Sequence, residues 1–221
     1  MDLALNGKVA LVTGAARDVG REIAAKGGKA KAYKADVSDY EAVKAMVDAV
    51  VKDFGALNIL VNNAGLAKRQ RFTDTTPDDW KNQIDICLYG AIHCCHAAAP
   101  HLEACKNGRI VSVIGDSSRV GESGLAIVAA ARAGVVALMK SLAREFGRSG
   151  TTANTVSLGL VETAHDRAWV EENREKLTRL YPVRRLGMPD HIAPAVALLA
   201  SPRAGWITGQ TLSISGGFSM V

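Results

Sequence analysis

A glycine-containing turn near the N-terminus is the first pattern that suggests chemistry. A short β-rich run from Lys8 to Thr13 ends at Gly14, and the apolar spacing beyond it becomes helical. The turn reads Thr13-Gly14-Ala15-Ala16-Arg17-Asp18-Val19-Gly20. A strand, a glycine turn and a helix in this order aim unpaired backbone N–H groups at one point, which suits a pyrophosphate. A purely structural turn is the alternative.

A second polar group follows a later β-rich run at residues 109–114. It reads Asp116-Ser117-Ser118-Arg119 and lies where open parallel sheets bind their ligands. Asp116 is a candidate general base, and Ser117 or Ser118 is a candidate hydrogen-bonding group for a substrate. The alternative is a plain polar turn, because Asp and Ser are common in turns.

The segment His93-Cys94-Cys95-His96 has residue types that bind metals. Adjacent residues on one helix diverge by about 100°, so they cannot converge on one ion. We therefore predict no metal site. Buried thiols between helices are the better interpretation of these cysteines.

Strands alternate with helices along the chain. We expect strands at residues 8–13, 31–35, 57–62, 109–114, 152–157 and 211–214, and helices near 19–24 and at 39–54, 77–102, 125–146 and 191–199. This alternation predicts an α/β fold, a doubly wound parallel sheet, in one domain over residues 1–221.

The composition limits the class of protein and its partners. The 221 residues are 48% hydrophobic and 22% charged, as in an ordinary globular domain. The net charge of +5 is dispersed and aromatic residues are only 5%, so we expect no nucleic-acid partner. No apolar run approaches the roughly 18 residues of a membrane helix, and no secretory signal is recognisable. Four cysteines suggest free thiols, so we expect a cytoplasmic protein without a membrane partner.

Several motifs in order resemble the short-chain dehydrogenase/reductase family. They are the glycine turn, Asn62-Asn63-Ala64-Gly65, Gly108-Arg109-Ile110-Val111, and Trp206-Ile207-Thr208-Gly209-Gln210 with Ser215-Gly216-Gly217. The resemblance runs from Asn6 to Val221. It implies a Rossmann-type sheet, NAD or NADP as cofactor, a small-molecule substrate, and a homo-oligomer, dimer or tetramer, built on the long helices.

The resemblance also implies which residues line the cofactor cleft. By motif match they are Thr13, Gly14, Arg17, Asp18, Val19, Gly20, Asp36, Val37, Asn63, Ala64, Gly65, Arg132, Gly159, Val161 and Thr163. Asp18 departs from the family, which has a glycine there; we expect Asp18 to cap the helix that starts at Val19. Leu158-Gly159 stands where Pro-Gly is usual. Residues 160–185 resemble the family's substrate lid, with a plain surface helix as the alternative.

One strand and one helix of the family are missing near residues 26–30. Gly14 and Asp36 are only 22 positions apart, which is enough for one helix and one strand. In one interpretation Asp36 is the acidic residue that binds the adenosine ribose. In the other, which we favour, Asp36 and Val37 belong to the family's third-strand motif and touch adenine. The preference for NAD or NADP then cannot be predicted.

The catalytic groups that the family resemblance leads one to expect are replaced. The family's serine, tyrosine, lysine and asparagine positions hold Gly115, Val128, Arg132 and Cys87. Arg132 can still hydrogen-bond the nicotinamide ribose, but its pKa is too high for proton relay. Ordinary alcohol oxidation should therefore be very slow. The remaining candidate donors are Tyr89, His93, His165 and Tyr181.

Three functions follow as hypotheses. The first is an NAD(P)-dependent oxidoreductase that acts on a small carbonyl, hydroxy or enoyl substrate through the atypical groups Asp116, Ser117 and Arg132. The second is a catalytically inactive nucleotide-binding or assembly subunit of the same fold. The third is a non-redox lyase or isomerase.

Overall fold

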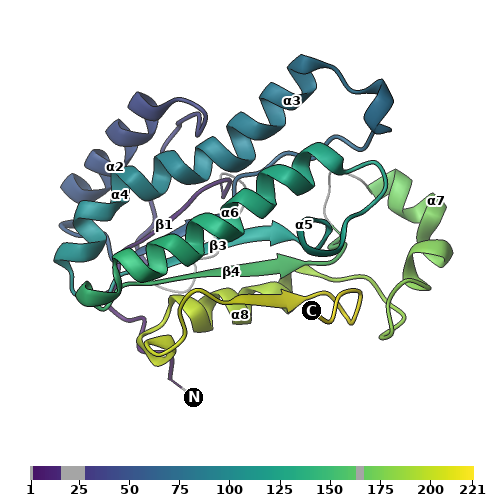
Figure 1. The fold of residues 1–221 in the computed structure, drawn as a ribbon. Helices are drawn as coiled ribbons and strands as arrows, with labels where there is room; N and C mark the ends of the chain where they lie inside the picture. The colour runs from purple at the N-terminus through teal and green to yellow at the C-terminus, as the bar shows by residue number, and fades with distance from the viewer. Residues whose placement is uncertain (1, 16–27, 163–166) are drawn as a thin grey trace.

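The core of the molecule is a five-stranded parallel sheet. The computed structural model describes residues 2–15, 28–162 and 167–221 (Figure 1). The strands lie side by side in chain order: β1 (Ala10–Val12), β2 (Ile59–Asn62), β3 (Arg109–Gly115), β4 (Thr152–Leu158) and β5 (Thr211–Ile214). All four neighbouring pairs are parallel. The central strands are buried along nearly their whole length, as expected for a sheet covered on both faces.

Helices cover both faces of this sheet, which confirms the predicted α/β architecture. On one face, Leu60 and Ile110 pack in the core cluster that contains residues of α2 (Tyr40–Phe54), α4 (Gly90–Ala104) and α6 (Ala126–Glu145). On the other face, Val61 and Val111 pack with residues of α8 (Pro189–Ala200). Successive strand residues point to opposite faces, so each strand serves both layers. Figure 1 shows α8 below the sheet and the other three helices above it.

The remaining elements lie around these layers. They are α3 (Pro77–Ile84), the π-helical turn η2 (Asp85–Tyr89), α5 (Ser117–Val120), α7 (Arg167–Thr178), and the 3₁₀ turns η1 (Phe72–Asp74), η3 (Gly147–Ser149) and η4 (Pro202–Ala204). The single helix that we expected over residues 77–102 is thus interrupted by a π-helical turn between α3 and α4.

The strand expected at residues 31–35 is absent, and this prediction was wrong. That segment has no regular structure, and among the described strands β1 pairs only with β2. Tyr33, Ala35 and Val37 are partly buried against the main core cluster. Their alternation with exposed residues has the period of a strand. No described strand pairs with this segment, so the alternation reflects side-chain packing on the core. The helix expected near residues 19–24 lies outside the described residues.

Helix α6 contradicts the expectation that no segment is apolar enough to cross a membrane. By length and composition alone it qualifies, with a mean hydropathy of 1.6 over an 18-residue window. The helix contacts β3 and β4 through residues such as Val135 and Met139, which are buried in the core. Its many alanines raise the hydropathy even at exposed positions such as Ala133 and Ala137.

The four cysteines are free thiols, as predicted. Cys94 and Cys95 lie buried in the main core cluster, where burial raises the pKa of each thiol to about 12. The Cys95 sulfur also accepts a hydrogen bond from the side-chain amide of Asn62 at the end of β2. These two cysteines therefore serve as small apolar residues of the core.

Candidate active site

The turns that follow β1 and β2 are joined by hydrogen bonds at the carboxyl edge of the sheet. The Thr13 hydroxyl accepts from the backbone N–H groups of Asn63 and Ala64, at 3.0 Å each. The Asn63 side-chain amide donates back to the Thr13 carbonyl at 3.0 Å. Gly14 has φ +68°, and a Cβ there would lie 2.9 Å from the Ala64 Cα. Only glycine therefore permits this close approach of the two turns.

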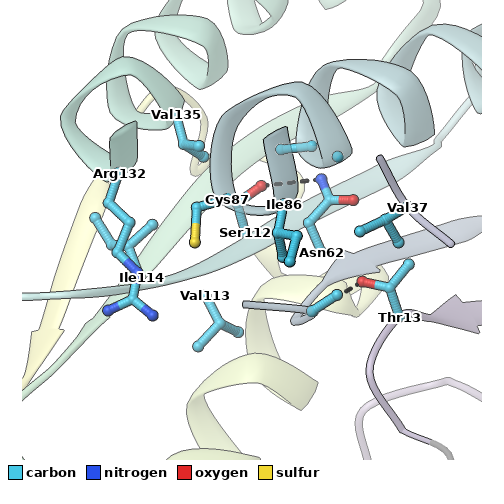
Figure 2. A pocket seen from close by; sticks show the side chains of 13 residues that line it. Thr13, Val37, Asn62, Ile86, Cys87, Ser112, Val113, Ile114, Arg132 and Val135 are labelled. Atoms are coloured by element: carbon cyan, nitrogen blue, oxygen red, sulfur yellow. Dashed lines mark hydrogen bonds between the residues drawn. The ribbon is translucent and has the colours of Figure 1, made fainter. Parts of the chain in front are cut away.

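Asn62 anchors the floor of the adjoining pocket (Figure 2). Its side-chain nitrogen donates to the Ser112 hydroxyl at 3.1 Å and to Cys95. Its side-chain oxygen is buried and has no hydrogen-bond partner in the described part of the chain. The amide thus ties β2 to β3 beneath the pocket.

Val37, and not the carboxylate of Asp36, lines the same pocket as Thr13. A Cβ at Gly90, where α4 begins, would lie 2.8 Å from a Val37 methyl carbon. Asp36 is exposed, and its carboxylate accepts from the backbone N–H and hydroxyl of Ser38, which lowers its pKa. Asp36 therefore shapes the turn that leads into α2.

Cys87 lies within the π-helical turn η2, and its thiol forms hydrogen bonds with the backbone of the chain that follows β2. Its sulfur donates to the Leu66 carbonyl at 3.1 Å and accepts from the Leu66 backbone N–H at 3.4 Å. One thiol thus makes the two complementary hydrogen bonds that a side-chain amide can make. π-helical turns often occur at functional sites, but the sequence carried no signal for this one.

Asp116 is held inside the edge of the sheet. Its side chain is fully buried, one oxygen accepts from the Ser157 hydroxyl, and the other accepts from the Ser213 hydroxyl at 2.7 Å. The guanidinium of Arg119 is 4.0 Å away. Both carboxylate oxygens are therefore already engaged by β4 and β5.

Arg132 extends from α6 toward the ends of β2 and β3. A Cβ at Gly115 would lie 2.9 Å from its Nη1, and a Cβ at Gly65 would lie 3.3 Å from its Nη2. Figure 2 shows the side chain beside Ile114, with the guanidinium away from the helix. Two glycines thus leave the space that the guanidinium occupies.

A larger cavity of about 430 Å³ opens on the other side of Arg132. Predicted residues that line it are Gly115, Asp116, Ser117, Arg132, Gly159 and Tyr181. The Tyr181 hydroxyl accepts from the Leu160 backbone N–H at 2.9 Å, and burial raises the pKa of this phenol. Leu125, Leu177 and Phe218 form an apolar part of the cavity wall, and the charged side chains of Arg69 and Glu122 also line it.

The rim of this cavity holds residues that the sequence did not single out as functional. Arg69 pairs with Glu122 at 2.5 Å and donates to the Ser123 carbonyl at 2.9 Å. Its guanidinium carbon lies 5.5 Å from the centre of the Trp169 ring on α7. The sequence gives no signal for these contacts, because Glu122 and Ser123 lie more than 50 residues beyond Arg69.

Several predicted site residues lie away from the two pockets or outside the described residues. Val161 forms a bridge with Gly187 at the base of the segment 160–185. Tyr89 and His93 do not line the cavity; the His93 ring contacts Tyr89 and Tyr40 on the side of α4 that faces α2. Arg17, Asp18, Val19, Gly20, Thr163 and His165 lie outside the described residues.

A glycine turn joined to the neighbouring turn at the carboxyl edge of a parallel sheet, with a cavity beside it, defines a Rossmann-type oxidoreductase fold. The chain belongs to the short-chain dehydrogenase/reductase family: residues 4–219 match the family described as "Enoyl-(Acyl carrier protein) reductase".

Bacterial 3-oxoacyl-[acyl-carrier-protein] reductases named FabG are among the similar proteins. The protein of Vibrio cholerae is 36% identical over 242 residues, covering 98% of this chain and 99% of the relative. That of Staphylococcus aureus strain Mu50 is 35% identical, covering 96% and 98%. That of Salmonella typhimurium is 34% identical over 244 residues, covering 99% and 100%.

This chain lacks residues at some positions of the alignment with the Vibrio cholerae protein. Its 242 positions are matched by 98% of 221 residues, or about 217, so about 25 positions have no counterpart here. A strand and a helix with their connections have about this size. The deficit has the size of the strand and helix that we inferred to be missing, and the described residues form a sheet of five strands.

Proposed function

We propose that this protein uses NADH or NADPH to reduce a small carbonyl or enoyl substrate. One observation carries the proposal: Arg132 lines both the pocket at Thr13 and Ala64 and the 430 Å³ cavity. A ligand in the first pocket and a ligand in the second would therefore meet at this residue. The matching family and the relatives are named as reductases of enoyl and 3-oxoacyl groups, which supports the same substrate classes.

Two features of the described part of the cleft support a nicotinamide dinucleotide as the cofactor. Gly14 and Gly65 keep side chains out of the cradle between the turns, and a Cβ at either position would meet Ala64 or Arg132. Thr13, Val37 and Ala64 would hold the cofactor, which would supply a hydride when bound.

The protein would act without the family's usual proton donor. In the family resemblance Val128 falls at the tyrosine position; it is fully buried with Cys87 and Ala131, and a valine side chain has no proton to donate. A conjugated substrate, whose carbon can take its proton from water, suits such a site best. Asp116 would act as a positioning residue rather than a general base, because Ser157 and Ser213 occupy both of its oxygens.

We further propose that residues 160–185 cover the substrate. This segment includes α7, and Trp169, Leu177 and Tyr181 from it line the cavity. The exposed small residues of α6, such as Ala130, Ala133 and Ala137, would pack against a second copy of the chain in a homo-oligomer. Size-exclusion chromatography with light scattering tests the oligomer.

Cofactor titration followed by turnover assays tests the proposed function. Quenching of tryptophan fluorescence by NADH and NADPH measures binding, and oxidation of either cofactor with 3-oxoacyl and 2-enoyl thioesters measures turnover. Binding with turnover supports the proposal. Binding without turnover favours an inactive nucleotide-binding subunit, and failure to bind either dinucleotide overturns both.

A further inference from the structure

The guanidinium of Arg132 has no partner among the described residues of the cleft. It makes no hydrogen bond or ion pair with any residue that the structure describes, although the side chain is half-buried. A guanidinium has five N–H donors and no acceptor, and it is costly to remove from water without partners. Its surroundings therefore favour an oxygen-bearing ligand.

The carboxylates that line the same cavity have other partners. Asp116 accepts from Ser157 and Ser213, and Glu122 pairs with Arg69 at the rim. Neither forms an ion pair with Arg132. Among the described residues, the N–H donors of this guanidinium are therefore left without acceptors.

The guanidinium lies where the missing side chain of Gly115 would be. Its Nη1 is 2.9 Å from the position of a Cβ on that glycine, at the carboxyl end of β3. In the family resemblance this position carries the serine that orients the substrate. Arg132 therefore places N–H donors at the point from which a hydroxyl side chain is absent.

We propose that Arg132 binds the substrate oxygen that becomes negatively charged during reduction, in place of the absent hydroxyl groups. This inference rests on the proposed function and names the group that serves it. As a hydride adds to carbon, a new C–H bond forms and the π electron pair ends on oxygen. That oxygen is an alkoxide in a 3-oxoacyl substrate and an enolate in a 2-enoyl thioester.

The proton that completes the reaction comes from water, because arginine stays protonated throughout the accessible pH range. Water protonates the alkoxide oxygen, or the α-carbon of the enolate, and leaves hydroxide. The reduced cofactor is oxidised by two electrons, and the substrate gains one hydride and one proton. Arg132 stabilises charge through its N–H groups and transfers no proton.

Three substitutions at one position test this role. Loss of one donor from an oxyanion site typically costs on the order of 10²–10³ in kcat, so we expect Arg132→Met to lower kcat by about 100-fold. The kcat of Arg132→Lys should fall less than that of Arg132→Met. Free guanidinium in solution should partly restore the kcat of Arg132→Gly. A larger fall in kcat with 3-oxoacyl substrates would identify the bound oxygen as an alkoxide. A larger fall with 2-enoyl substrates would identify it as an enolate. Arg144→Met, at an exposed position of the same helix, is the matched control.

Two further measurements separate this role from cofactor binding and from folding. The NADPH dissociation constant should change by less than about 3-fold in Arg132→Met, and kcat should not titrate with a tyrosine-like pKa. Weakened NADPH binding with unchanged kcat would overturn the proposal, because Arg132 would then serve the ribose. Circular dichroism verifies that each variant is folded.

A binding experiment decides the inference even if the wild-type protein turns over neither substrate. Butanoate carries a carboxylate that mimics the charged oxygen, and calorimetry measures its affinity without any reaction. We expect Arg132→Met to weaken butanoate binding by at least about 10-fold. Equal binding, or no binding to the wild-type protein, would refute the oxygen-anion site. If the wild-type protein turns over neither thioester substrate, the proposed function is refuted, whereas the result of the butanoate experiment still decides the oxygen-anion site.

Discussion

The Arg69 guanidinium carbon lies 5.5 Å from the centre of the Trp169 ring, and this contact joins the chain beyond β2 to α7. The same arginine pairs with Glu122 on the segment between α5 and α6. Three segments that are distant in sequence thus meet over the mouth of the cavity. The contact is a cation–π interaction at a partly exposed site, worth about 0.5–1 kcal/mol.

Trp169→Leu tests whether this contact retains the substrate. Loss of about 0.5–1 kcal/mol corresponds to a 2- to 5-fold change in an equilibrium constant. We expect KM for a thioester substrate to rise by about that factor while kcat changes little. Trp206→Leu is the matched control, because Trp206 is fully exposed. Equal effects of the two substitutions would contradict a role for the α7 contact.

Asp116→Asn tests the assignment of this residue to structure rather than to proton transfer. The amide keeps one acceptor oxygen but turns an N–H₂ group toward a serine hydroxyl, so a buried hydrogen bond is weakened. We expect the free energy of unfolding to fall by about 1–3 kcal/mol in a urea titration, and kcat to fall by less than about 10-fold. Asp48→Asn on the exposed side of α2 is the control. Abolished turnover in a folded variant would instead support a general base.

Gly115→Ser tests the fit between this position and Arg132. The serine Cβ would approach Nη1 to 2.9 Å, and the flexible arginine would move away. We expect the melting temperature to change little and kcat/KM to fall by about 10-fold. Gly147→Ser, whose Cβ would meet nothing within 4 Å, is the control.

The double variant Gly115→Ser with Arg132→Lys completes a mutant cycle. A shorter cation leaves room for the serine, so the double variant should be more active than the sum of the single effects predicts. Strict additivity would show that the two positions are not coupled.

The buried thiols predict how stability changes at high pH. Burial raises the pKa of Cys94 and of Cys95 from 9.0 to about 12, because the thiolate is disfavoured in the core. Their contribution is complete below pH 9, and it is lost as the pH rises from 9 toward 12, since the unfolded chain releases these protons first. The free energy of unfolding of the wild-type protein should therefore fall from pH 8 to 9 and to 10. The fall should be less steep in Cys95→Ala, which has one buried thiol fewer. Equal slopes would contradict this assignment.

The sequence predicted the fold from local patterns that burial imposes. The runs at Arg109 and at Thr152 became the interior strands β3 and β4, which are buried along nearly their whole length although β4 contains several polar residues. It failed at Tyr33, whose alternating neighbours pack on the core without forming a strand. A periodicity of two reports which side chains are buried, and it does not report whether a neighbouring strand is present.

The candidate site was predictable only where sequence neighbours define it. The turns at Thr13 and Asn63 were expected and lie together. The hydrogen bond that engages Asp116, by contrast, comes from Ser213, which lies 97 residues further along the chain. No local pattern reports that a carboxylate is already engaged.

The π-helical turn η2 holds one residue more between α3 and α4 than an α turn would. Deletion of a single residue at 85–89 would restore an ordinary helix and would leave α3 and α4 facing as they do now, because the wide turn absorbs the extra residue. The local bulge that brings the Cys87 sulfur to the Leu66 backbone would be lost, whereas substitutions within the turn would keep it.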